Sequence, residues 1–117
     1  MDLNKLTNKL KEIPFENWEI KETHSEWNEY VTKINDKKIK IKYLPPQDPR
    51  DDMIVKLDII SSKNETLVEG ITPPGIYGFV LDLQHQEIKK LAEQNYQYEK
   101  KKYEKNQKNL SEFLNSI

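Results

Sequence analysis

The sequence offers two histidines, His24 and His85, as candidates for a catalytic base. Hydrolysis and acyl transfer need a nucleophile beside a base that a third group orients. Neither histidine lies in a recognisable motif of that kind. The chain has only three glycines, Gly70, Gly75 and Gly78, and no Walker sequence, so we expect no phosphate-binding loop. The sequence therefore predicts no catalytic residue, and we expect the protein not to be an enzyme.

Three aspartates, Asp48, Asp51 and Asp52, are the residues that could hold a divalent cation. Hard cations prefer several oxygen ligands that converge from a loop. The spacing here matches no calcium loop, and aspartate beside proline is also typical of an ordinary turn. The absence of cysteine excludes disulfides and thiolate metal sites. We expect no metal and no cofactor, and a metal-dependent enzyme is only the third functional hypothesis.

Arg50 is the one arginine in a chain that otherwise uses lysine. Its guanidinium can bind a carboxylate or a phosphate through two hydrogen bonds, which lysine cannot do. It lies between residues 45 and 51, where three prolines order the loop in advance. Two roles remain open, an ion pair with a neighbouring aspartate or a contact with a partner. We predict that this loop serves binding more than folding.

Lysines gather on an expected strand, where Lys38, Lys40 and Lys42 share one face, and again between residues 100 and 108. Such rows can contact the phosphates of nucleic acid. They are equally typical of a strand protected against edge-to-edge aggregation and of a solvated helix face rich in glutamate. Association with nucleic acid through the three strand lysines is therefore the alternative functional hypothesis.

The bulk composition predicts one small folded domain over residues 1–117. The chain is 35% hydrophobic and 33% charged, with a mean hydropathy of -0.93, which is near the polar limit for folding. Its net charge of -1, however, argues against disorder and against a dedicated nucleic-acid binder. The N-terminus has no basic segment followed by an apolar one, and no window is apolar enough to span a membrane. We expect a cytoplasmic protein without a membrane partner.

The apolar pattern predicts an α+β fold, an antiparallel sheet of four to five strands with a short N-terminal helix and a long C-terminal helix. Leu3, Leu6 and Leu10 recur at helical spacing, and Pro14 ends the first helix, expected over residues 2–12. Alternating residues predict strands within 15–81. One hairpin should direct three residues of each strand to the core, Tyr30, Thr32 and Ile34 opposite Tyr43, Ile41 and Ile39.

The C-terminal helix is expected from about residue 82 to 117, either continuous or broken near 106–109. At about 1.5 Å per residue it would be about 50 Å long, whereas a strand of eight residues covers only about 27 Å. The sheet cannot cover such a helix. We therefore expect its aromatic residues to dock on a second copy or another protein, unless the final segment folds back. We also expect the first helix to lie beside it.

The leading functional hypothesis is a non-catalytic protein-binding module, a small stand-alone accessory, inhibitor or assembly protein. Proteins of this size without a catalytic motif are often encoded by phages and mobile elements, which is an association and not a mechanism. Trp27 lies either on an exposed strand face or under a helix. The partner is expected to be another protein or a second copy. The predicted partner-binding residues are Trp27, Arg50, Tyr96, Tyr103 and Phe113.

Overall fold

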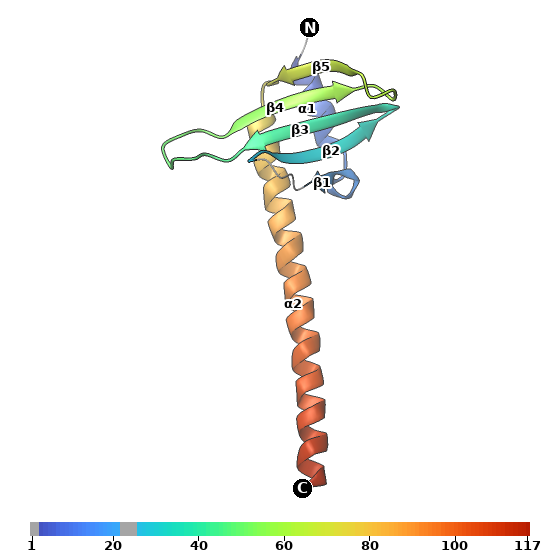
Figure 1. The fold of residues 1–117 in the computed structure, drawn as a ribbon, viewed down its shortest axis with the longest axis vertical. Helices are drawn as coiled ribbons and strands as arrows, with labels where there is room; N and C mark the ends of the chain where they lie inside the picture. Colours follow the sequence, from blue (N-terminus) through green and yellow to red (C-terminus); the bar gives the residue numbers. More distant parts are fainter. Residues whose placement is uncertain (1–2, 22–25) are drawn as a thin grey trace. The chain divides into compact units, whose positions relative to one another are not determined.

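The computed structural model describes residues 3–21 and 26–117 of the chain (Figure 1). It has two compact units, residues 1–81 and residues 82–117, which are described separately below. His24 and the N-terminal end of the helix expected at residue 2 lie outside the described residues. In chain order the elements are α1 (Leu3–Lys11), the 3-10 turn η1 (Phe15–Asn17), β1 (Glu19–Lys21), β2 (Asn28–Ile34), β3 (Lys37–Leu44), β4 (Ile54–Ile60), β5 (Thr66–Ile71) and α2 (Ile76–Ser116).

The five strands form one antiparallel sheet in the order β1-β2-β3-β4-β5, so each strand pairs with its neighbours in sequence. Together with the short N-terminal helix and the long C-terminal helix, this confirms the predicted α+β class. Consecutive pairing needs only short connections, which suits a small domain. The middle strand is β3, hydrogen-bonded on both sides.

The β2–β3 hairpin has the predicted faces but a different register. Tyr30 pairs with Ile41 and Thr32 pairs with Ile39, two residues from the expected partners. The cause is the turn, which spans only two residues because Asn35 adopts a left-handed backbone with φ of 57°. A shift of two residues preserves the side-chain faces, so Tyr30, Thr32, Ile39, Ile41 and Tyr43 are buried as predicted. Ile34 lies on the same face but is only half-buried, at the end of β2.

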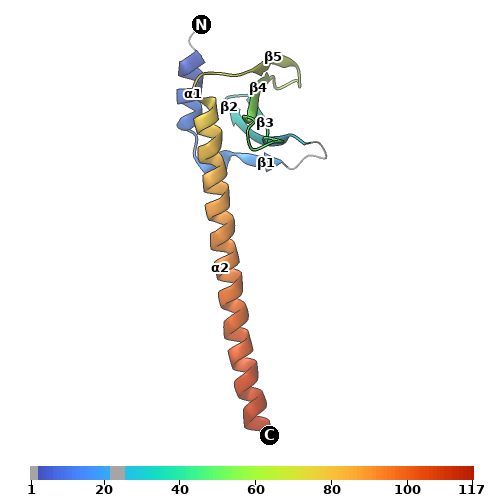
Figure 2. The same ribbon diagram turned by 90° about the vertical axis from the view of Figure 1, so that its left-hand side faces the viewer.

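The core of residues 1–81 lies on one face of the sheet, where α1 and the first residues of α2 are also placed (Figure 2). Leu10 of α1 is fully buried, and the Thr7 hydroxyl donates a hydrogen bond of 2.8 Å to the carbonyl oxygen of Pro74. The ring centroids of Trp18 and Phe79 are 5.6 Å apart. The N-terminal helix thus lies beside the start of α2, as the sequence predicts.

The C-terminal helix begins earlier than predicted and follows one of the two alternatives that the sequence left open for residues 106–109. It begins at Ile76 rather than near residue 82, because Ile76, Phe79 and Val80 are buried at helical spacing. Gly75 precedes it with a φ of 79°, a conformation that favours glycine. The helix also continues through residues 106–109 without the break that the sequence left open.

Candidate functional site

The Arg50 side chain binds the carboxylate of Asp48. Its Nε lies 3.3 Å from Oδ1 and its Nη2 lies 3.2 Å from Oδ2, while the backbone N–H of Arg50 donates to Oδ1 at 2.9 Å. These donors, the side chain first and the backbone second, lower the pKa of Asp48 below 3.8. The Arg50 side chain is nevertheless 90% exposed, so the structure shows the local ion pair and leaves the predicted contact with a partner untested.

Replacing Arg50 with alanine is expected to raise the pKa of Asp48 toward its ordinary value, because the side-chain donors are lost while the backbone N–H remains. In the native protein this pair contributes stability above the ordinary pKa of aspartate, and the contribution is lost as pH falls through the lowered pKa. A carboxyl NMR titration of both proteins measures the change. An unchanged Asp48 pKa in Arg50→Ala would contradict the ion pair. A second variant, Arg50→Lys, tests the role of the loop. If this variant fails to fold, the arginine is structural and the predicted binding role is contradicted.

Lys38, Lys40 and Lys42 share the sheet face opposite the core residues of β3, as the alternation predicts. Lys42 forms an ion pair within the sheet, because its Nζ lies 2.9 Å from Oδ2 of Asp58 on β4. The other oxygen of Asp58 accepts a hydrogen bond of 2.8 Å from the backbone of Gly70. Since β3 is the middle strand, the explanation that these lysines protect a sheet edge is wrong.

Trp27 is half-buried and immediately precedes β2, so it is neither a core residue nor a fully exposed one.

Sequence reasoning missed an apolar groove of about 490 Å³ in the same unit, between α1 and the sheet. Five apolar side chains line it, Leu6, Ile13, Ile34, Ile39 and Ile59, with Lys9, Glu12, Asn35 and Lys37 beside them. The sequence carried no signal for this groove, because the groove depends on how α1 packs against the β2–β3 hairpin and not on a local pattern.

The second unit, residues 82–117, presents the longest exposed apolar pattern of the described chain. Every residue from Ile88 to Ile117 is exposed. Apolar side chains recur on α2 at intervals of seven, three and four residues, which is the spacing of a helix that packs along another helix. We call this row, together with the polar residues Glu99 and Asn106 that interrupt it, the α2 seam: Ala92, Tyr96, Glu99, Tyr103, Asn106, Leu110, Phe113 and Ile117, the last residue lying just beyond the helix end.

The large side chains of the seam are between 52% and 82% exposed, with Leu110 at the lower limit and Ile117 at the upper. Three of the five predicted partner-binding residues, Tyr96, Tyr103 and Phe113, belong to this one row. Trp27 and Arg50 belong to the other unit and share no element with it. The structure therefore places Tyr96, Tyr103 and Phe113 in one row of the helix, and leaves their contact with a partner untested.

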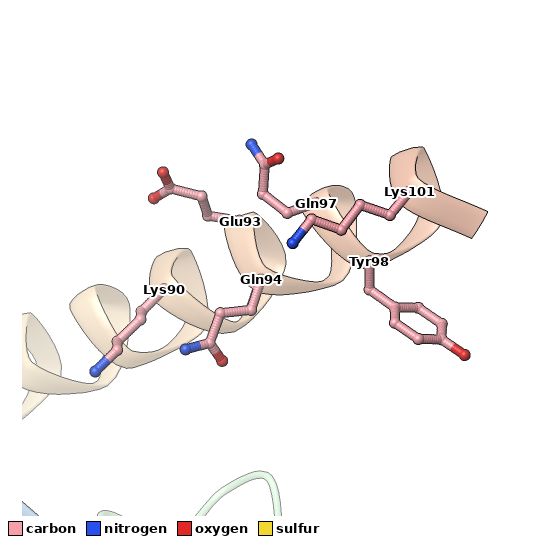
Figure 3. A pocket seen from close by; sticks show the side chains of 6 residues that line it. All are labelled: Lys90, Glu93, Gln94, Gln97, Tyr98 and Lys101. Atoms are coloured by element: carbon pink, nitrogen blue, oxygen red, sulfur yellow. The ribbon is translucent and has the colours of Figure 1, made fainter. Parts of the chain in front are cut away.

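The side chains of α2 outside the seam are mostly polar. Figure 3 shows six of them fanning out from the same helix: Lys90, Glu93, Gln94, Gln97, Tyr98 and Lys101. All six come from one element, so the shallow hollow between them has no second wall and no converging set of reactive groups. Within residues 82–117, three of the four aromatic residues belong to the seam, and Tyr98 lies outside it. The large apolar side chains Ile88, Leu91 and Leu114 are exposed outside the seam as well.

Neither protein-family models, curated proteins nor solved structures give a match to this chain. Within residues 3–21 and 26–117, no helix combines the length and the apolar character needed to cross a membrane. The same described residues contain no group of three or more histidine or acidic side chains placed to hold a metal ion.

Proposed function

We propose that the protein is a non-catalytic protein-binding module, an accessory, inhibitor or assembly protein, and that its binding element is the α2 seam. The observation that carries this proposal is the row of six exposed apolar side chains over residues 92–117, at helical spacing and interrupted only by Glu99 and Asn106. Most helices in proteins gain their stability by packing an apolar face. A long apolar row exposed to water is instead typical of a surface that another protein covers.

Two tyrosines of nearly equal exposure allow a matched test of this proposal. Tyr103 lies in the seam and is 64% exposed, whereas Tyr98 lies outside it and is 65% exposed. We expect tagged wild-type protein and Tyr98→Asp to capture the same binding protein, including an untagged copy of this chain, from native lysate. Tyr103→Asp should lose it, because aspartate places an unpaired charge in the buried row.

Circular dichroism of each variant should first show an unchanged fold, since both positions are exposed. Equal capture by Tyr103→Asp and the wild type would contradict the assignment of the binding surface to the seam. Equal loss in both tyrosine variants would contradict it as well, because binding would then follow overall charge and not position.

The register of the sheet supports nucleic-acid association as a second candidate. It places lysines of β2, β3 and β4 on one face: Lys33, Lys38, Lys40, Lys42 and Lys56. Glu29 and Asp58 lie among them, which reduces the positive potential of that face. Elution from heparin over a salt gradient separates the two functions, since phosphate binding by several lysines is strongly salt-dependent. Under the leading proposal, Lys40→Gln leaves the elution salt unchanged.

A further inference from the structure

We infer that the partner of the α2 seam is a second copy of the same chain, and that the two seams form a parallel, in-register, two-stranded coiled coil from Ala92 to Ile117. This inference rests on the proposed function, because it names the protein that covers the seam. Three features of the seam support it: its period, the positions of its polar residues and the charges beside it.

The period of the seam requires a long helical partner. Tyr96, Tyr103, Leu110 and Ile117 are seven residues apart and occupy position a of the repeat, while Ala92, Glu99, Asn106 and Phe113 occupy position d. A straight α-helix drifts by about 20° per seven residues relative to such a repeat, so the row stays buried only where two helices supercoil. A second copy supplies a helix with the same repeat and the same length.

The positions of Glu99 and Asn106 favour the parallel direction. In a parallel, in-register pair each layer faces its own copy, so these polar residues face each other and Leu110, Phe113 and Ile117 form apolar layers. In an antiparallel pair, the two seams overlap over their full length when Ala92 of one copy lies opposite Ile117 of the other, so that the numbers of facing residues sum to 209. It sets Leu110 against Glu99 and Tyr103 against Asn106 of the second copy, which buries polar groups against apolar ones.

The residues beside the seam are compatible with the same arrangement. In a parallel pair, position g of one helix lies beside position e of the next repeat on the other. The three g–e pairs within the seam are Asn95 with Lys100, Lys102 with Gln107, and Asn109 with Leu114. Each contains at most one charge, so the lysine-rich helix meets no like-charge repulsion there.

The least favourable layer of the coil is the one that contains Glu99. Position d on one helix is adjacent to position e of the same repeat on the other, so the carboxylate of Glu99 lies next to Lys100 of the second copy. This opposite charge offsets part of the repulsion between the two glutamates. Polar layers of this kind lower the stability of a coiled coil and specify its register.

The absence of cysteine from the sequence makes disulfide trapping a direct test. Helices whose axes lie 8–10 Å apart, each with a Cα radius of 2.3 Å, bring facing Cα atoms to about 3.5–5.5 Å, which overlaps the range that a disulfide spans. In the antiparallel alignment the two copies of residue 92 are instead about 38 Å apart along the axis. We expect Ala92→Cys to form a disulfide-linked dimer at least about tenfold faster than Gln94→Cys, which lies on the opposite side of the helix.

Leu110→Cys provides a second seam position, with Ser111→Cys as its neighbouring control, in case residue 92 lies too near the start of the coil to react. A disulfide only in a mixture of Ala92→Cys and Ile117→Cys would overturn the parallel direction. Failure of all seam cysteines to exceed their controls would overturn the second copy as the partner. The capture experiment with Tyr103→Asp would still report binding of another protein, so the two failures are distinguishable.

Discussion

Replacing Leu10 with alanine is expected to lower the free energy of unfolding by about 2–5 kcal/mol. Leu10 is 0% exposed and belongs to α1, which at nine residues is too short to be stable in water unless it is packed. The Thr7 hydroxyl, one turn earlier in α1, donates a hydrogen bond to the carbonyl oxygen of Pro74, which links α1 to the segment before α2. Loss of the leucine side chain leaves a cavity at the point where α1 is held.

Urea unfolding monitored by tryptophan fluorescence measures this effect, because Trp18 is buried and lies against Phe79. Asn8→Ala is the matched control on the exposed side of the same helix and should change the free energy of unfolding by less than about 0.5 kcal/mol. Deletion of residues 1–12 should lower the melting temperature markedly. A Leu10→Ala effect as small as that of the control would contradict the packing of α1.

Replacing Leu110 with aspartate is expected to weaken self-association at least about 100-fold, equivalent to about 3 kcal/mol. In the proposed coil, this change removes a leucine from both helices and sets two carboxylates opposite each other in a buried layer. Ser111→Asp adds the same charge one residue further on, outside the seam, and should have little effect. Sedimentation velocity over a dilution series measures the dimer dissociation constant of each variant and of the wild type. Equal weakening by the two variants would contradict the seam.

The side-chain faces of the sheet could be predicted from the sequence because strand alternation is a local pattern. Tyr30, Thr32, Ile39 and Ile41 all lie on the predicted core face. The register could not be predicted, because it depends on Asn35 adopting a positive φ within a turn of two residues. The ion pair of Lys42 with Asp58 was missed because it depends on the register between β3 and β4, which no local pattern specifies.

The limits of α2 were ambiguous because short patterns fit more than one structure. Residues 76–81 form an apolar run of six, which fits a strand as well as the first turns of a helix. Asn109 and Glu112 resemble a helix start, yet the helix continues past them, since both residues are also tolerated inside a helix. The ion pair of Arg50 with Asp48 was among the predicted alternatives because the two residues are close in sequence.

Sedimentation equilibrium of the unmodified chain tests most directly whether a second copy covers the α2 seam. The chain has a mass of 14.0 kDa. We predict twice that mass at micromolar concentration, with dissociation to the single-chain mass on dilution, because the exposed seam is buried only in the dimer. The single-chain mass at every concentration, including the highest the protein tolerates, would contradict the account and leave the seam to a different partner.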